Sequence, residues 1–236
     1  MLGSIIDIFF PPVCPVCEKA LKDKGKSLCG DCEAGFSRLR IIAPVCGVCG
    51  APFASETGGE HTCGLCLAER PPFTKARSVY FYEGPVLTAI HKFKYNGHVI
   101  LAQAFAGIFE DAAADCPAPD IIVPVPLHIN RLKKRGFNQS LLIARKMSKT
   151  LKTGLSYDNL ARTRATEPQV NLKASERAKN VSSAFFIRAP AAFKGKRILL
   201  VDDVYTTGAT IRECSKVLKK AGAEVYALTL ARAVKL

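Results

Sequence analysis

Eight of the ten cysteines form four Cys-x-x-Cys pairs within the first 66 residues, and this spacing constrains the fold more than any other feature. The pairs are Cys14/Cys17, Cys29/Cys32, Cys46/Cys49 and Cys63/Cys66. Two such pairs supply the four thiolates that tetrahedral Zn(II) requires, because each short turn directs both sulfurs at one ion. The spacing therefore predicts two structural zinc ions held by tandem zinc ribbons. Sequential and cross-braced pairing both satisfy it.

A disulfide framework and a redox motif are the alternatives for these cysteines. Disulfides need an oxidising compartment. The apolar start at residues 1–12 has Asp7 within it, no basic flank and no small-residue cleavage site, so it is not expected to be an export signal. In the cytosol the thiols would stay reduced, which argues against a disulfide framework. A redox pair is expected once beside a βαβ unit, not four times in a loop-rich segment. His61 could replace a cysteine ligand, but all four thiolate positions are already filled, so we expect an exposed loop residue.

The N-terminal segment also bears on localisation. No uncharged apolar run reaches eighteen residues, so we expect no membrane-spanning helix. Without a recognisable signal peptide, the chain is expected to be cytoplasmic. The apolar positions Leu2, Ile5, Ile6 and Phe9 favour docking onto the body of the protein, and peripheral contact with the inner face of the membrane is the alternative.

The positive charge of the chain is concentrated in one stretch. Residues 121–200 hold seventeen Lys or Arg and three acidic residues, so their net charge of +14 equals that of the whole chain. A block of one sign indicates a surface that meets phosphate, either on a polyphosphorylated ligand or on a nucleic-acid backbone. A solvated face without a partner is the alternative.

Helices and short apolar strands alternate along the rest of the chain. Arg70-Pro-Pro-Phe73 indicates a linker, which divides a double zinc ribbon at 1–70 from a larger domain at 71–236. The elements expected in the larger domain are strand 78–82, helix 86–96, helix 99–114, strand 121–125, helix 139–152, strand 198–201, helix 211–221 and strand 224–230. This alternation is typical of βαβ units and predicts an α/β fold with a parallel sheet.

A ligand site is indicated where the apolar run 198–201 ends. Asp202 and Asp203 follow the run, and the loop 206–210 then enters a helix. The helix N-terminus favours an anion, while carboxylates accept hydrogen bonds from vicinal sugar hydroxyls. The predicted ligand is therefore a phosphorylated sugar. An acidic magnesium pocket is the alternative for the two carboxylates, and the Thr-Thr-Gly-Ala-Thr loop decides against it.

The segment Ile198-Leu-Leu-Val-Asp-Asp-Val-Tyr-Thr-Thr-Gly-Ala-Thr210 resembles the phosphoribosyl pyrophosphate (PRPP) signature of type I phosphoribosyltransferases, with Tyr205 where most of those enzymes have an aliphatic residue. With the paired ribbons, Phe93-Lys-Tyr95, Pro124-Val-Pro-Leu127 and Arg135-Gly-Phe-Asn-Gln139, the whole chain resembles the competence protein F (ComF) family. The resemblance implies a parallel-sheet type I phosphoribosyltransferase-like domain preceded by a small zinc-ribbon module. It also implies binding of PRPP with Mg(II), a role in DNA uptake during natural transformation, and contact with the competence machinery.

The same resemblance implies a set of PRPP-binding residues. Two carboxylates would hold the ribose hydroxyls, and five loop residues the 5′-phosphate. The segment after Pro124-Val-Pro126 stands where a pyrophosphate loop is expected, and two arginines are its candidate cations. The set is Asp202, Asp203, Thr206, Thr207, Gly208, Ala209, Thr210, Arg131 and Arg135. The cation-rich stretch 161–180, which includes Arg162, Arg164, Arg177 and Asn180, is predicted to be a lid over the site, with an exposed connection as the alternative. No catalytic base is identified.

A separate nucleic-acid surface is predicted on the basic helix 139–152. Four cations recur at helical spacing one to three turns beyond the expected pyrophosphate loop, too far along the helix for all of them to reach one small ligand. They are Arg145, Lys146, Lys149 and Lys152. Three functions follow: a phosphoribosyltransferase that displaces pyrophosphate from PRPP, a single-stranded-DNA-binding competence factor without turnover, and an interaction protein whose pocket is a relic. The sequence leaves the acceptor and the turnover open.

Overall fold

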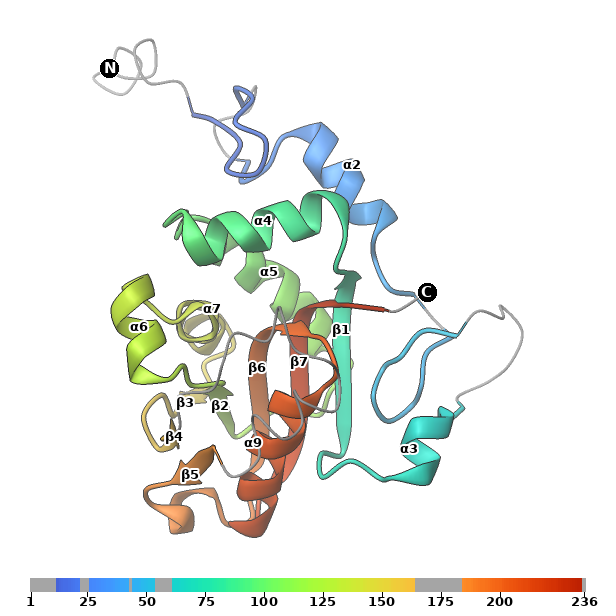
Figure 1. Ribbon diagram of the computed structural model, residues 1–236, viewed down its shortest axis with the longest axis vertical. Coiled ribbons are helices and arrows are strands. Elements are labelled where there is room, and N and C mark those ends of the chain that lie inside the picture. Colours follow the sequence, from blue (N-terminus) through green and yellow to red (C-terminus); the bar gives the residue numbers. More distant parts are fainter. Residues whose placement is uncertain (1–11, 22–25, 43, 54–60, 164–183, 235–236) are drawn as a thin grey trace.

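A five-stranded parallel sheet forms the centre of the protein (Figure 1). The computed structural model describes residues 12–21, 26–42, 44–53, 61–163 and 184–234. The strands, in sheet order, are β1 (Lys75–Phe81), β7 (Glu224–Arg232), β6 (Arg197–Tyr205), β2 (Ile121–Pro124) and β3 (Gly154–Leu155). Every neighbouring pair in this sheet is parallel, which confirms the predicted α/β fold. A small antiparallel pair, β4 (Leu160–Arg162) and β5 (Phe185–Ile187), lies beside it.

Helices cover both faces of the sheet. The side chains of α4, α5 and α7 share one hydrophobic cluster with the sheet, and those of α9 share another with β5. The helices are α2 (Gly30–Arg38), α3 (Gly64–Ala68), α4 (Gly84–Tyr95), α5 (Leu101–Ala113), α6 (Ile129–Arg135), α7 (Gln139–Thr150), α9 (Ala209–Lys220) and the short 3-10 turn η2 (Pro190–Phe193). Within the described ranges, none of them combines the length and apolarity needed to cross a bilayer.

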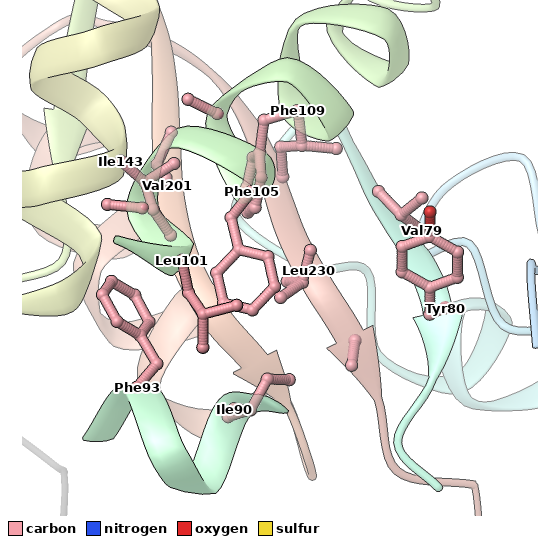
Figure 2. Close-up of a cluster of buried hydrophobic side chains, with 14 of the residues drawn as sticks. Val79, Tyr80, Ile90, Phe93, Leu101, Phe105, Phe109, Ile143, Val201 and Leu230 are labelled. Carbon is pink, nitrogen blue, oxygen red and sulfur yellow. The ribbon is translucent and has the colours of Figure 1, made fainter. Parts of the chain in front are cut away.

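Burial on both faces explains why residues 198–201 of the central strand, β6, are all apolar. Along β6, Ile198 and Leu200 belong to the cluster on the α9 side, whereas Leu199 and Val201 belong to the cluster on the opposite side. Because the strand is buried on both faces, each residue must be apolar. Figure 2 shows the cluster on the side opposite α9, in which side chains from α4, α5, α7 and the strands meet.

Strand β6 is longer than the expected run 198–201, and this changes the setting of the two carboxylates. The strand continues to Tyr205 because β7 runs beside it, pairing Asp202 with Thr229 and Tyr205 with Arg232. On the other side, β2 ends at Pro124, opposite Val201. Asp202 and Asp203 therefore lie within the strand, at the point where its β2 neighbour has ended, and not in the loop after it.

The connections leaving β2 and β6 run in opposite directions across the sheet. From β2 the chain passes through α6 and α7 to β3 at one edge, and from β6 it passes through α9 to β7 on the other side. In open parallel sheets, ligands bind in the crevice at the carboxyl ends of two such strands. The fold thus places a crevice at the carboxyl ends of β2 and β6.

Candidate functional site for a sugar phosphate

A cavity of about 660 Å³ opens at this crevice. One wall of the cavity holds Asp202, Asp203 and the loop that leads into α9. The other walls come from α4, α6, the start of α7 and β4. The cations that line it are Lys94, Arg131, Lys134, Arg135 and Arg162. Five cations facing two carboxylates give the cavity an excess of positive charge, which suits a polyanion that also carries hydroxyl groups.

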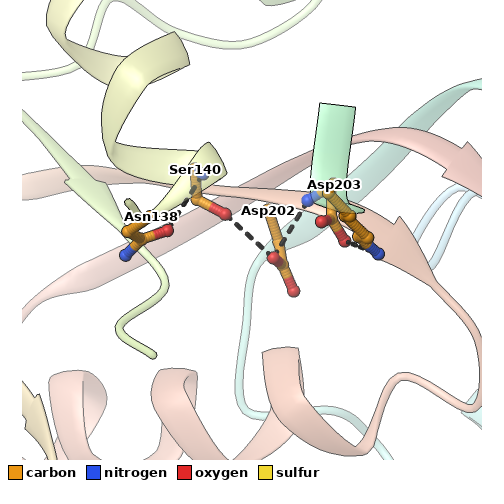
Figure 3. Close-up of polar contacts among 5 residues, drawn as sticks. Asn138, Ser140, Asp202 and Asp203 are labelled. Carbon is orange, nitrogen blue, oxygen red and sulfur yellow. Dashed lines mark hydrogen bonds and ion pairs between the residues drawn. The ribbon is translucent and has the colours of Figure 1, made fainter. Parts of the chain in front are cut away.

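Asp202 is held by hydrogen bonds from two directions (Figure 3). Its Oδ1 accepts from the Oγ of Ser140 at 3.0 Å and from the backbone N–H of Asp203 at 2.9 Å. Asn138 caps α7 by accepting from the Ser140 N–H at 3.0 Å, and its Nδ2 donates to the Val125 carbonyl at 3.0 Å. The start of α7 is thereby fixed to the end of β2 and to the carboxylate on β6.

The electrostatic state of Asp202 follows from this position. Burial and the neighbouring charge of Asp203 raise its pKa to about 7. The Asp203 N–H, the charge of Lys94 and the Ser140 hydroxyl act in the opposite direction without cancelling the rise. A carboxyl group with this pKa is ready to respond to a bound cation or hydroxyl group near neutral pH.

Asp203 forms an ion pair with Lys94 of α4. The Lys94 Nζ lies 2.9 Å from Oδ1 of Asp203, and the two side chains are only 16% and 13% exposed. Burial by itself would lower the pKa of Lys94, but the attraction and hydrogen bond to Asp203 outweigh it, so the pKa is raised. Lys94 therefore keeps its charge, and the ion pair anchors α4 against the carboxyl end of β6.

The predicted pyrophosphate cations lie on a helix, which corrects the expectation of a loop. Arg131 and Arg135 are four residues apart on α6, so they share the face that lines the cavity. The His128 side chain caps this helix, and Gly136, with φ of 81°, ends it. Burial and then the charge of Arg135 lower the pKa of Arg131, so a bound anion would relieve this repulsion.

The predicted phosphate loop lies at the N-terminus of α9. Thr206 and Thr210 line the cavity, and Ala209 N–H donates to Thr207 Oγ1 at 3.4 Å. Gly208 caps the helix with φ of 76°, a left-handed conformation that favours glycine. We define residues 206–210 as the phosphate loop. The N-terminus of a helix of twelve residues, with its backbone N–H groups and the positive end of its dipole, suits an anion at this end of the cavity.

The eight predicted metal ligands gather in two groups, and the pairing is sequential. We call Cys14, Cys17, Cys29 and Cys32 the first cysteine site, and Cys46, Cys49, Cys63 and Cys66 the second cysteine site. In each, the four sulfurs lie within 4.8 Å of one another, and tetrahedral zinc with bonds of about 2.3 Å would place them ~3.8 Å apart. His61 is exposed and lies against the Phe53 ring, outside the group.

The donor chemistry of the second cysteine site also fits zinc. The Cys46 Sγ accepts N–H groups from Cys49 at 3.5 Å and from Cys63 at 3.3 Å. Burial alone would raise the pKa of Cys46, but these N–H groups and that of Val48 lower it to about 6. Because the thiolate is the ligand, the Cys46 thiol is suited to hold zinc, and the close grouping of four sulfurs suits structural zinc at both sites.

Comparison with known proteins finds two family models that match parts of this chain. The family model described as a double zinc ribbon domain matches residues 5–67, and that described as a phosphoribosyl transferase domain matches residues 138–234. Competence protein F of Haemophilus influenzae is 31% identical over 233 residues, which cover 95% of this chain and 99% of the relative. The chain belongs to the competence protein F (ComF) family.

Other relatives have the same extent. DNA utilization protein YhgH of Escherichia coli is 31% identical over 219 residues, covering 90% of this chain and 93% of the relative. Competence protein ComFC of Streptococcus pneumoniae is 28% identical over 208 residues, 86% of each. A solved orotate phosphoribosyltransferase from Aeropyrum pernix aligns with 58% of this chain and 63% of its own at 18% identity, with a TM-score of 0.37. That score is too low to support an inference, so membership of the ComF family rests on the sequence relatives.

Several cavity residues of this ComF family member had no role assigned from sequence. Lys94 and Ser140 hold the two carboxylates, and Gln139 is 1% exposed with an Nε2 that has no hydrogen-bond partner among the described residues. They lie in or beside the motifs Phe93-Lys-Tyr95 and Arg135-Gly-Phe-Asn-Gln139, so these motifs were the sequence signal that could have identified them as site residues. Arg162 of the expected lid lines the cavity, whereas Arg164, Arg177 and Asn180 lie outside the described residues.

The predicted DNA-binding cations lie away from the cavity. Arg145, Lys149 and Lys152 are exposed on or just after α7, and none of them lines the cavity. Lys146 donates to Oε1 of Gln103 at 2.6 Å. The structure therefore separates these four cations from the carboxylate pair, as the helical spacing predicts.

Proposed function

We propose that this protein binds PRPP, together with Mg(II), in the cavity between β2 and β6, and that it is a phosphoribosyltransferase-like ComF protein that serves DNA uptake. One observation carries the proposal. A carboxylate pair and a helix N-terminus form one side of a single cavity, and arginines on α6 and β4 form another. PRPP has the matching chemistry, since it carries vicinal hydroxyls, a 5′-phosphate and a pyrophosphate.

The arrangement suggests one orientation of the ligand. The ribose hydroxyls would meet Asp202 and Asp203, the 5′-phosphate would lie in the phosphate loop, and the pyrophosphate would lie against Arg131 and Arg135. Each group then meets the type of partner that binds it well: carboxylates for hydroxyls, helix N–H groups for phosphate and planar guanidinium groups for pyrophosphate. Mg(II), when bound with the ligand, would supply additional neutralisation of the pyrophosphate charge.

The same groups suit transfer chemistry. A nitrogen nucleophile that attacks the anomeric carbon forms the new C–N bond while the C–O bond to pyrophosphate breaks and the electron pair leaves with the pyrophosphate. The proton lost from the nitrogen passes to the departing pyrophosphate or to water. The arginines on α6 would stabilise the charge on the departing pyrophosphate, and the carboxylates would hold the ribose in place. Such catalysis relies on positioning and charge, so it needs no dedicated general base in the cavity.

The biological setting is proposed from the relatives. One is named a competence protein and another a DNA utilization protein, and each aligns with nearly the whole of this chain. We therefore place the PRPP-binding site within a protein that acts in DNA uptake together with the competence machinery.

Calorimetric titration with PRPP and Mg(II) tests the ligand. The double variant Asp202→Asn, Asp203→Asn should bind PRPP about a hundredfold more weakly or not at all, because both charged acceptors are lost. Asp120→Asn is the matched control, since Asp120 precedes β2 at the opposite end of that strand and should leave PRPP affinity unchanged. Undiminished affinity in the double variant would show that the pocket assignment is wrong.

Single-stranded DNA binding is the second candidate function, and the exposed cations on α7 favour it. Their distance from the cavity allows a strand to bind while the sugar-phosphate site is occupied. Neutralised phosphates release counterions, so four or five contacts predict a log–log slope of affinity against salt of about −2.8 to −3.5. Binding without strong sequence preference is expected, because phosphate contacts do not identify bases.

A charge reversal separates the two functions. Lys146→Glu with Lys149→Glu should abolish oligonucleotide binding and leave PRPP affinity within about twofold, because neither residue lines the cavity. Loss of PRPP binding in this variant, or complete displacement of the oligonucleotide by PRPP in the parent protein, would show that one surface serves both ligands.

A further inference from the structure

Tyr205 lies directly against the phosphate loop. It ends β6, is 5% exposed, and its ring fills the space where a side chain at position 208 would stand. A Cβ at Gly208 would lie 2.2 Å from the Tyr205 hydroxyl oxygen and 2.4 Å from its ring carbon Cζ. The ring therefore sets how closely the loop approaches the sheet, and Gly208 is the residue that allows this approach.

Arg232 holds the Tyr205 ring. It ends β7 directly beside Tyr205 in the parallel register, and its guanidinium carbon lies 4.1 Å from the ring centroid. Both side chains are at least nine-tenths buried. A cation over an aromatic ring is held more strongly when water is excluded, so this contact restrains the ring more than the exposed contact of Arg188 with Phe186 at 5.8 Å.

The same guanidinium reaches the second cysteine site. Its Nη1 donates to the Cys49 carbonyl at 2.8 Å, and its Nη2 donates to the Cys49 Sγ at 3.7 Å. Within the part of the chain that the structure describes, Arg232 forms no ion pair with a carboxylate. A buried charge is costly without compensation, and four thiolates around one Zn(II) carry a net charge of about −2. The cysteine site is thus suited to be the counterion of Arg232.

We propose that Tyr205 and Arg232 are positioning residues, which couple the conformation of the phosphate loop to the second cysteine site. The chain of contacts runs from Cys49 to the Arg232 guanidinium, to the Tyr205 ring and to Gly208. It gives the aromatic ring at position 205 a role, because the ring contacts both Arg232 and the phosphate loop. The identity of the ligand rests on the proposed function, but the coupling is a property of the free protein.

Hydrogen exchange in the full-length, zinc-loaded protein without ligand tests the coupling directly. The Arg212 N–H donates to the Gly208 carbonyl at 2.8 Å, so its exchange reports the order of the first turn of α9. Arg232→Met and Tyr205→Leu should each speed this exchange about tenfold, because the loop loses its support. Tyr205→Phe keeps the ring and should restore the parent rate, and Arg188→Met, which removes an exposed cation–ring contact, should not change it.

Ligand titrations separate positioning from general stability. Ribose 5-phosphate probes the phosphate loop, and pyrophosphate with Mg(II) probes the opposite end of the cavity. Tyr205→Leu and Arg232→Met should weaken ribose 5-phosphate binding about tenfold and pyrophosphate binding less than twofold, whereas general loosening of the fold would weaken both. Tyr205→Phe should bind both ligands as the parent does.

The outcomes distinguish this inference from the proposed function. Parent exchange rates in both Arg232→Met and Tyr205→Leu would overturn the coupling, whatever the protein binds. Failure of the parent to bind PRPP would overturn the proposed function, and the exchange measurement would still decide the coupling. If Arg232→Met loses its zinc or fails to fold, the comparison of Tyr205→Leu with Tyr205→Phe decides it, since neither substitution touches a cysteine.

Discussion

The two cysteine sites share one motif but are built into opposite faces of the sheet. The first cysteine site joins the hydrophobic cluster of α4, α5 and α7, and the second joins the cluster of α9. The first docks through Phe36 of α2, which is edge-on to Tyr80 of β1 at 5.4 Å, and through an ion pair of the exposed Glu18 with Lys92 of α4. The second also has directed hydrogen bonds from arginines of the sheet, since Arg77 donates to the Cys46 and Gly47 carbonyls and Arg232 to that of Cys49.

This difference assigns different tasks to the two sites. An apolar contact and an ion pair at an exposed carboxylate fix few atoms of the first cysteine site, which covers the core beside α4. Directed hydrogen bonds fix particular backbone groups, so the second cysteine site is fixed to the first half of β1 through Arg77 and to the carboxyl end of β7, beside the phosphate loop, through Arg232. We therefore expect the first site to serve stability alone and the second to serve stability and ligand binding together.

The largest predicted effect compares Cys46→Ser with Cys14→Ser. Both cysteines are fully buried, and each is the first of the four cysteines in its site. Each substitution should therefore lower the zinc content from two ions per chain to one, measured by elemental analysis. Cys46→Ser should weaken ribose 5-phosphate binding more than about tenfold, and Cys14→Ser less than about threefold, because only the second site supports the loop.

The control for this comparison is the thermal midpoint, which should fall in both cysteine variants because each loses a structural metal. Equal losses of ligand affinity in the two variants would remove the distinction between the sites. A metal content near zero in folded, reduced parent protein would remove the zinc-ribbon interpretation itself.

A pair of glycines gives a second, smaller contrast. A Cβ at Gly50 would lie 2.7 Å from the Ala76 carbonyl oxygen, and Gly50 also has φ of 68°. A Cβ at Gly35 would lie 2.8 Å from Cγ of Pro85, but Gly35 is within helix α2, where alanine is favoured by about 1 kcal/mol. Gly50→Ala should therefore lower Tm by at least about 5 °C and Gly35→Ala by less, measured by calorimetry. A larger loss in Gly35→Ala would show that the first site is the more rigidly docked.

Local patterns in the sequence predicted both cysteine sites and the phosphate loop, because each is formed by residues close together in the chain. The contacts that organise the cavity were not predictable in this way. Ser140 meets Asp202 across 62 residues, and Arg232 meets Cys49 across 183. Such contacts depend on the order of strands in the sheet, which spacing alone does not fix.

Two element boundaries show the same limit. Helix α6 has no buried residue, so it lacks the apolar period that identifies a helix in sequence, and it is set by the His128 cap and Gly136. Strand β6 extends to Tyr205 because β7 lies beside it, and no property of the residues 202–205 themselves indicates that neighbour. The assignment of 1–70 and 71–236 as separate domains stays a prediction, as do the ligand roles of the cavity residues.

The smallest predicted effect concerns pH and isolates the cavity from both cysteine sites. Asp202 has a folded pKa of about 7, well above its value in an unfolded chain of about 3.9. A carboxyl group with a raised folded pKa stabilises the fold fully below the unfolded pKa, and this contribution is lost as the pH rises through 7. Asp202→Asn has no such group to titrate, so it does not lose stability in this way. The Tm of the variant minus the Tm of the parent should therefore be about 3 °C larger at pH 8.5 than at pH 6, in ligand-free, zinc-loaded protein.

Asp120 provides the control of opposite sign for this titration. The N–H of Arg197 lowers the pKa of Asp120, so this carboxylate contributes stability above its unfolded pKa and loses it only as the pH falls into the acid range. Asp120→Asn should therefore lower Tm by the same small amount at pH 6 and at pH 8.5. Because zinc-bound thiolates do not take up protons in this interval, the difference between the two variants reports the carboxylate at the ligand site. A pH-independent Tm difference in Asp202→Asn would show that the carboxyl group is ionised throughout, and that Lys94 and Ser140 compensate its charge before any ligand arrives.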